Sequence, residues 1–113
     1  MEDTNQILIP ETFQAIYKSP RTGKLTVAWP ILLERYEYCE DLSNMLVETA
    51  SNMMHSLHIT EDDVFDRVHM GLTTPESRTN PEESYWVLQR LAELMRWHGS
   101  LESYRPMDSL AVS

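Results

Sequence analysis

The stretch "PILLERYEYCEDLSNMLVETASNMMHSLH", residues 30–58, decides the fold that this sequence predicts. Pro30 suits the first turn of a helix, because the N–H that proline lacks has no helical partner there in any case. At about 100° per residue, the apolar side chains that follow fall on one stripe of a helix: Leu32, Tyr36, Cys39, Leu42, Leu46, Ala50, Met53 and Leu57. We therefore predict a long amphipathic helix over residues 30–58 that packs through this stripe.

The opposite stripe of the same helix is acidic and polar. It contains Glu34, Glu37, Asp41, Asn44, Glu48, Asn52 and His55. These carboxylates are expected to face water, since burying an unpaired charge is very costly. The apolar stripe advances in steps close to four and three residues, as in helical bundles and coiled coils. A homodimer through this helix is therefore an alternative, although the small Ser43 and Ala50 in the seam weaken a coiled-coil interpretation.

Local signals predict two further helices. Thr60 is a good N-cap for a short helix over residues 60–70, where the acids at positions 61–63 suit the positive end of the helix dipole. In this helix Val64, Phe65 and Val68 are predicted to face inward, and Gly71 to end it.

The sequence Asn80-Pro81-Glu82-Glu83 repeats the start signal, with a cap, a proline and an acid in the first turn. It predicts a C-terminal helix over residues 81–98, stopped by Gly99. The segment 100–113 lacks sustained periodicity and is predicted to be a partly ordered tail.

Residues 12–29 are predicted to form a β-hairpin. Two β-rich runs flank "PRTG", where Gly23 can adopt the left-handed conformation that a bulged hairpin turn requires. One register places the apolar residues on a single face: Phe13, Ala15, Tyr17, Leu25, Val27 and Trp29. The predicted fold class is α+β and mostly α, with an N-terminal hairpin packed on a three-helix bundle. Because residues 10–18 also suit a short helix, an all-α bundle is the alternative.

Length and composition indicate one globular domain spanning residues 1–113. Apolar residues make up 42% of the chain and charged residues 24%, which is ordinary for a protein that buries one core. No apolar run approaches the length of a membrane span, and the acidic N-terminus does not resemble a signal peptide. With a single cysteine, Cys39, no internal disulfide can form, so we expect a cytoplasmic protein that does not bind membranes. Cys39 itself is expected to be an inert core residue.

The net charge of −9 is unevenly distributed. Residues 34–66 hold nine acids against Arg35 alone, whereas residues 10–30 are weakly basic. This field repels nucleic acid and favours a protein partner with a basic surface. We therefore predict no direct binding of nucleic acid.

No catalytic or cofactor-binding motif is present. Asp62, Asp66 and His69 share one face of the short helix, but that face is predicted to be exposed to solvent. A di-iron bundle site would need Glu-x-x-His pairs from two helices, and the sequence contains none. We predict no metal and no cofactor. A small enzyme or metal-binding protein with a site near His55, His58 and His69 is a less favoured alternative.

The last helix carries the most informative pattern. Trp86, Arg90, Glu93 and Trp97 are predicted to point away from its apolar stripe, and Trp and Arg are the residues that most often anchor interfaces. We predict a non-enzymatic protein–protein interaction module, a small acidic adaptor or regulator. Its predicted partner-binding residues are these four together with Glu34, Glu37, Asp41 and Glu48. A nucleic-acid-mimicking inhibitor of a basic DNA-binding protein is the alternative, which requires carboxylates near phosphate spacing.

Overall fold

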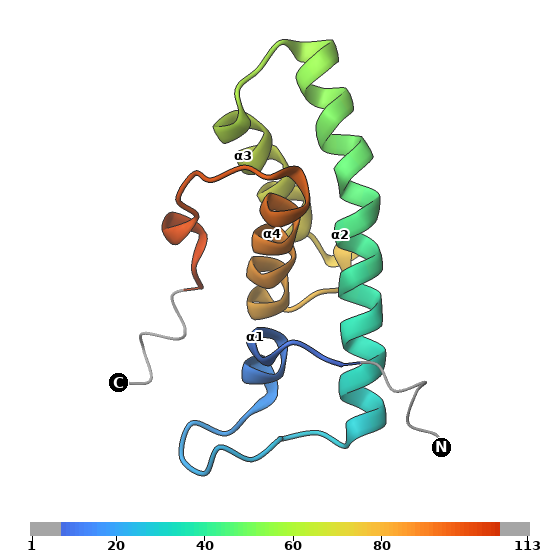
Figure 1. Cartoon of the computed structure of the whole chain (residues 1–113), viewed down its shortest axis with the longest axis vertical. Helices are drawn as coiled ribbons and strands as arrows, with labels where there is room; N and C mark the ends of the chain where they lie inside the picture. Colours follow the sequence, from blue (N-terminus) through green and yellow to red (C-terminus); the bar gives the residue numbers. More distant parts are fainter. Residues whose placement is uncertain (1–7, 107–113) are drawn as a thin grey trace.

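The computed structural model describes residues 8–106, and in this range every regular element is helical (Figure 1). The α-helices are α1 (Glu11–Gln14), α2 (Trp29–Leu57), α3 (Glu61–Leu72) and α4 (Pro81–Met95). Three short 3₁₀ turns lie between or after them: η2 (Ala15–Tyr17), η3 (Pro75–Ser77) and η4 (Glu102–Tyr104).

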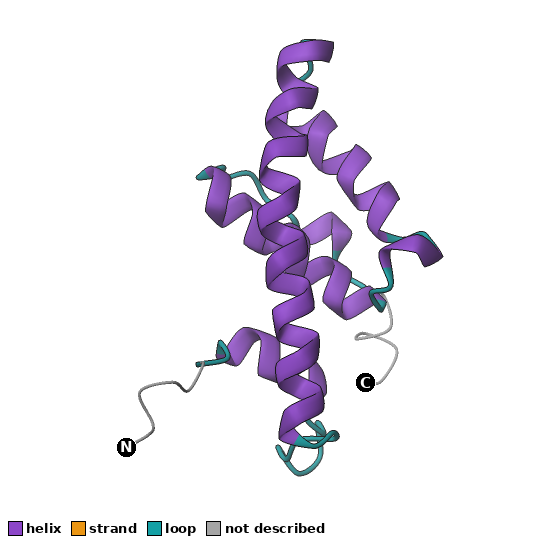
Figure 2. Cartoon of the chain, turned by 90° about the vertical axis from the view of Figure 1, so that its right-hand side faces the viewer, coloured by secondary structure: helices purple, strands orange, loops and turns teal. Residues whose placement is uncertain are grey.

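Helix α2 is the spine of the molecule. Its 29 residues span roughly 43 Å, and α3 and α4 pack along one side of it. The chain runs up α2, down α3 and up α4, so that α2 and α4 are parallel neighbours, while α1 lies below α4 against the lower part of α2 (Figure 1). The opposite side of α2 faces the viewer in Figure 2, where no other helix covers it.

The core forms where α1, α3 and α4 meet α2. Phe13, Leu32, Phe65, Leu88 and Leu91 are almost completely buried. These side chains come from all four α-helices, so burial of their apolar surface supplies the main force that holds the bundle together. The predicted inward orientation of Val64, Phe65 and Val68 is confirmed, as is burial of Leu32, Cys39 and Ala50 in the long helix.

The predicted N-terminal β-hairpin was wrong, and the all-α alternative fits. Phe13 and Tyr17 lie in consecutive helical turns, and the sole β feature in the described range is an isolated bridge between Lys18 and Leu25. Residues four positions apart share a face both in a helix and in a strand. The spacing of Phe13 and Tyr17 therefore could not distinguish a helix from a strand. Only the helical form buries Phe13 fully while leaving Ala15 exposed. The turn at Gly23 does have the predicted positive φ, of 73°.

The predicted helix starts are confirmed, but two of the ends differ. The Thr60 side chain caps α3, and Asn80 and Glu83 form a complete capping box at α4. Helix α3 continues through Gly71 to Leu72, and α4 ends at Met95 because Arg96 adopts a left-handed φ of 61°. The predicted end of α4 near residue 98 was therefore too late, and Trp97 lies beyond the helix.

The segment after α4 folds back onto α3. Leu101 is buried, and Tyr104 donates a hydrogen bond to Asp66 while its ring lies 4.8 Å from that of His69. Residues 107–113 of the predicted tail lie outside the described range. No helix of the described chain is both long and apolar enough to cross a membrane.

Candidate functional site

A buried polar cluster joins the N-terminal segment, α2 and α4. Its centre is Glu83, whose side chain is 1% exposed. Arg35 donates two hydrogen bonds to the carboxylate, from Nε to Oε2 at 2.9 Å and from Nη2 to Oε1 at 2.8 Å. The Tyr17 hydroxyl donates to Oε2 at 2.5 Å, and the Asn80 N–H donates to Oε1 at 3.1 Å. Every lone-pair direction of this buried carboxylate therefore has a donor.

The pKa shifts in this cluster indicate that it stabilises the fold and does not transfer protons. Burial by itself would raise the pKa of Glu83, but the hydrogen bonds from Arg35, Tyr17 and Asn80 outweigh it and lower the pKa below 4.5. Burial, followed by the hydrogen bond to Glu83, raises the pKa of Tyr17 to about 12. Both groups thus hold one protonation state through the neutral range, which is the opposite of what a general acid or base requires.

A second ion pair links α2 to α4 near the surface. Arg90 donates from Nε and Nη2 to the two oxygens of Glu40, both at 2.9 Å, and from Nη1 to Glu93 at 3.0 Å. The hydrogen bonds from Arg90 lower the pKa of Glu40. Arg90 and Glu40 keep 32% and 22% of their side-chain surface exposed, and Glu93 keeps 69%. Water can therefore reach all three groups.

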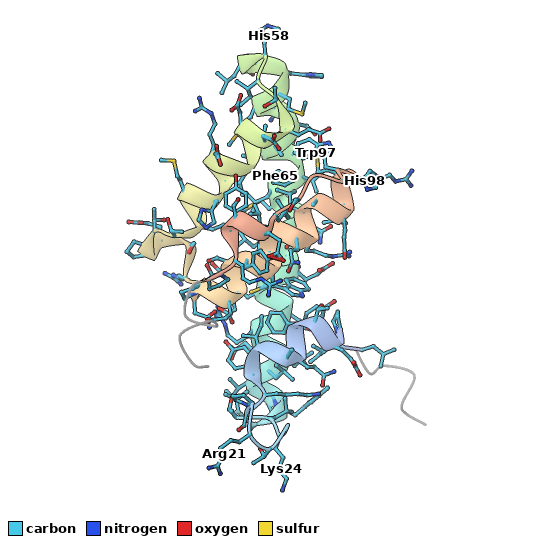
Figure 3. All side chains as sticks on the ribbon, turned by 90° about the vertical axis from the view of Figure 1, so that its left-hand side faces the viewer. Arg21, Lys24, His58, Phe65, Trp97 and His98 are labelled. Atoms are coloured by element: carbon cyan, nitrogen blue, oxygen red, sulfur yellow. The ribbon has the colours of Figure 1, made fainter. Side chains whose placement is uncertain are left out.

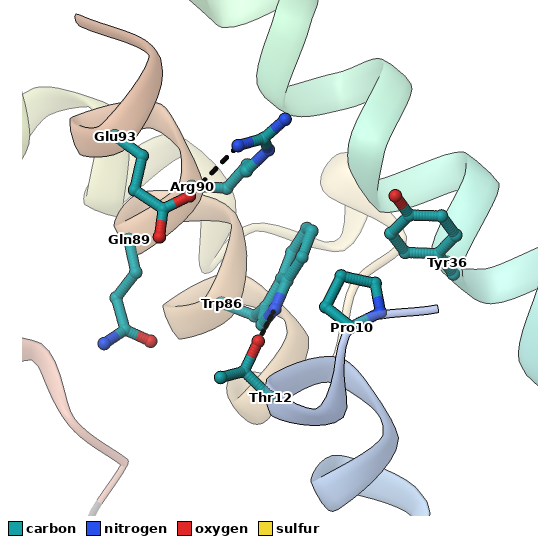
Figure 4. A pocket seen from close by; sticks show the side chains of 7 residues that line it. All are labelled: Pro10, Thr12, Tyr36, Trp86, Gln89, Arg90 and Glu93. Carbon is teal, nitrogen blue, oxygen red and sulfur yellow. Dashed lines mark hydrogen bonds and ion pairs between the residues drawn. The ribbon is translucent and has the colours of Figure 1, made fainter. Parts of the chain in front are cut away.

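A pocket of about 250 Å³ opens beside this ion pair, between α1, α2 and α4 (Figure 4). It is lined by Pro10, Thr12, Tyr36, Trp86, Gln89, Arg90 and Glu93. Figure 4 shows Arg90, Glu93 and Gln89 on the α4 side, with Pro10 and the Tyr36 ring across from them. Three of the four predicted partner-binding residues of the last helix thus line one hollow.

Trp86 does not have the orientation predicted for it. Its side chain is 6% exposed, its ring lies edge-on to Phe13 with centroids 5.1 Å apart, and its Nε1–H donates to the Thr12 hydroxyl at 3.0 Å. Prediction of an outward-pointing Trp86 was wrong, because α1 covers that side of α4. Trp97 is half-buried against Phe65, with ring centroids 5.3 Å apart (Figure 3). Neither indole is a free interface anchor.

The predicted acidic stripe of the long helix is exposed along its whole length. Glu34, Glu37, Asp41 and Glu48 are all exposed, and none of them forms an ion pair with a described residue. They lie within about 60° of arc on α2 and extend over roughly 21 Å along it. We call these four residues the α2 carboxylate face. The prediction that this stripe is wet is confirmed.

The histidines do not form a common site. His58 lies at the far end of α2, where it adopts a left-handed φ of 53°, and His98 projects from the loop after α4 (Figure 3). His55 is exposed near the end of α2, and His69 packs on Tyr104. Within residues 8–106, no three His, Cys, Asp or Glu side chains come together in a way that could hold a metal ion. The thiol of Cys39 is fully buried, and burial raises its pKa to about 12.

Sequence reasoning missed the partners of Glu83 and Arg90. The capping-box motif marked Glu83 as a helix-start residue, but nothing in it indicated burial or pairing with Arg35, 48 positions away. Glu40 was counted only as one acid among nine. Its place at the edge of the apolar stripe, next to Tyr36 on the following turn, was the available signal that it faces another helix.

The arrangement offers a wet acidic helix face, a small half-polar pocket beside it, and no converging acid, base and nucleophile among the described residues. Comparison of the chain with protein-family models, with curated proteins and with solved structures found no match.

Proposed function

We propose that this chain is a non-enzymatic protein–protein interaction module, and that the α2 carboxylate face is its contact surface for a partner with a basic surface. The observation that carries the proposal is that four carboxylates are exposed, and form no ion pair with a described residue, on the side of α2 that no other helix of the described chain covers. A cytoplasmic setting fits the single cysteine.

The charge distribution supports this choice of partner. Elsewhere in the described chain, Glu83 and Glu40 are each neutralised by an arginine. The four residues of the α2 carboxylate face form no ion pair with a described residue, and an exposed field of one sign raises the association rate of an oppositely charged partner. Because the face is carried by a helix anchored through its other side, it is ordered before binding, so little conformational entropy is lost on association.

The two alternative functions have less support. An enzyme needs a pocket with converging groups of shifted pKa. Glu83 and Tyr17, whose pKa values are shifted, are engaged with each other in a buried hydrogen-bond cluster, and the thiol of Cys39 is fully buried. Mimicry of a duplex needs two rows of negative charge, whereas the α2 carboxylate face is a single narrow stripe.

The test compares two variants that lose the same charge. In the face variant, E34Q/E37Q/D41N/E48Q, the α2 carboxylate face becomes neutral; in the remote variant, E11Q/E61Q/D63N/E76Q, four exposed carboxylates outside α2 are replaced. Both variants and the unmodified protein are immobilised and used to capture partners from the native cell at increasing salt. We expect the unmodified protein and the remote variant to retain the same partner, and the face variant to lose it.

Captured partners are then purified and their affinity measured by calorimetry. The proposal requires a partner that binds at least about tenfold more weakly to the face variant than to the remote variant, with an affinity that falls as salt rises. Equal loss in both variants would mean that only net charge matters, and equal retention would mean that α2 is not the contact surface; either result overturns the proposal.

A further inference from the structure

The pocket between α1, α2 and α4 lies directly beside the α2 carboxylate face. On the helical wheel of α2, Tyr36 in the pocket, then Glu40, then Glu37 follow one another in steps of about 40° to 60°. Glu40 therefore bridges the two features, with its carboxylate turned toward Arg90 on the pocket rim. A partner that lies on the α2 carboxylate face also reaches the mouth of the pocket.

The charges around the pocket do not cancel. Arg90 supplies one positive charge, while Glu40 and Glu93 supply two negative charges at 2.9 and 3.0 Å from it. One negative charge is left over at the rim. It is best placed on Glu93, because Glu40 receives two hydrogen bonds from Arg90 and Glu93 receives one. Glu93 is also the more exposed of the two carboxylates.

The walls of the pocket combine apolar and polar surface. Its apolar part consists of Pro10, the half-buried Tyr36 ring and the small part of the Trp86 ring that is not buried, and the exposed Gln89 also lines the pocket. Lysine and arginine side chains combine a long apolar stem with a charged end, and they place the stem on apolar surface and the charge in water or on a carboxylate. The pocket likewise places apolar side chains next to a carboxylate, that of Glu93.

We propose that this pocket takes one lysine or arginine side chain of the basic partner, with the alkyl stem against Tyr36, Pro10 and Trp86 and the cationic end on Glu93. The inference rests on the proposed function for the identity of the partner, because it names the single residue that the pocket would select from a basic surface. It differs from that function in its location, since none of the α2 carboxylate face lines the pocket.

The test uses small probes that cannot span the α2 carboxylate face. N-acetyl-arginine amide and N-acetyl-lysine amide are titrated into ¹⁵N-labelled protein, with N-acetyl-citrulline amide as the uncharged analogue of arginine. The chain has three tryptophans, so the indole N–H signals of Trp29 and Trp97 serve as internal controls for that of Trp86, which alone among them lines the pocket. We expect the cationic probes to shift the Trp86 signal and the Gln89 amide in a saturable way, and the citrulline probe to shift them much less.

Matched variants locate the charge that is responsible. Glu93→Gln is expected to weaken binding of the arginine probe about tenfold, as the loss of a charge-assisted hydrogen bond does. Glu76→Gln removes an exposed carboxylate outside the pocket and is expected to leave binding unchanged. Glu93 is mostly exposed, so its replacement does not endanger the fold.

The results separate this inference from the proposed function. Equal shifts with arginine and citrulline probes, or equal binding by Glu93→Gln and Glu76→Gln, would overturn the inference. A poly-lysine peptide that shifts the backbone signals of the α2 carboxylate face but not the Trp86 indole would overturn the pocket assignment alone. The face variant could bind the arginine probe and yet fail to bind the basic surface of its partner. This result would confirm that the pocket binds a cationic side chain independently of the α2 carboxylate face.

Discussion

Two arginine–glutamate pairs join α2 to α4, and they differ mainly in burial. Arg35 and Glu83 meet inside the junction with the N-terminal segment, where the carboxylate also accepts hydrogen bonds from Tyr17 and from the Asn80 backbone. Arg90 and Glu40 meet with nearly the same distances, but at the rim of a pocket, with a second carboxylate competing for the guanidinium. The same kind of ion pair is thus buried in one place and partly exposed to solvent in the other.

The difference follows from solvent. A charge that is enclosed and fully hydrogen-bonded is strongly destabilising when its partner is removed, because the remaining charge stays buried and unpaired. A charge at the surface is rehydrated when its partner leaves, so the pair contributes little to stability but can exchange partners. The Glu83 cluster is therefore expected to stabilise the fold, and the Arg90 cluster lies at the surface where we propose that a partner binds.

The largest effect on stability is expected from Glu83→Gln. This change leaves Arg35 partly buried without its carboxylate, so the free energy of unfolding should fall by about 3 kcal/mol. Urea unfolding followed by circular dichroism measures it. Glu82→Gln, one position earlier, is the control and should change the free energy by about 0.5 kcal/mol or less. An equal change in the free energy of unfolding in the two variants would show that the buried Glu83 carboxylate stabilises the fold no more than an ordinary surface carboxylate does.

The buried Glu83 cluster should also make the stability of the protein depend on pH in the acid range. Because the pKa of Glu83 is lower in the folded protein than its ordinary value of 4.5, its contribution to stability is present above that value and is lost as the pH falls through the folded pKa. Unfolding free energies measured between pH 6 and the acid limit of stability should decline below about pH 4.5. The decline should be clearly shallower in Glu83→Gln; an unchanged slope would show that other carboxylates control acid unfolding.

The surface pair is expected to matter less. Glu40→Gln should lower the free energy of unfolding by about 1 kcal/mol or less, since both partners remain hydrated and Arg90 keeps Glu93. The effect should shrink further in high salt, whereas that of Glu83→Gln should persist. If Glu40→Gln lowered the free energy of unfolding as much as Glu83→Gln does, the Arg90 cluster would also be a major contributor to the stability of the fold.

The smallest effect, and one of opposite sign, is expected from the α2 carboxylate face. Glu34 and Glu37 are three positions apart and Glu37 and Asp41 four, so these like charges repel one another across a helix turn. The E34Q/E37Q/D41N/E48Q variant should be as stable as the unmodified protein or more stable by about 0.5 kcal/mol. Its thermal midpoint and circular dichroism spectrum test this, and a marked loss of stability would show that the face has structural partners.

Sequence patterns predicted the elements that depend on neighbouring residues. The caps at Thr60 and Asn80 were predictable because each requires a hydrogen bond to a residue three positions away. The carboxylate face was predictable because helical periodicity alone separates it from the apolar stripe. The N-terminal hairpin failed because Phe13 and Tyr17 have a spacing that suits both a strand and a helix.

The orientation of Trp86 failed for a different reason. Helical periodicity correctly placed Trp86 on the side of α4 away from Leu88 and Leu91. A helical wheel does not show, however, which other part of the chain packs on that side. Here α1 does, with Phe13 against the indole and Thr12 as its hydrogen-bond acceptor. The helix that was mistaken for a strand is thus also the one that covers the tryptophan, and the first error caused the second.

By itself, the sequence determined where the three main helices begin, which face of the longest one is wet, and that the protein carries a strong negative charge. The tertiary structure alone decided that Glu83 is buried beneath Arg35 and Tyr17, that Trp86 is covered, and that Arg90, Glu93 and Tyr36 share one pocket. The physical reason is distance along the chain. Caps and periodicity act within a few residues, whereas the pairing of α2 with α4 joins residues about fifty positions apart and depends on how all the helices pack.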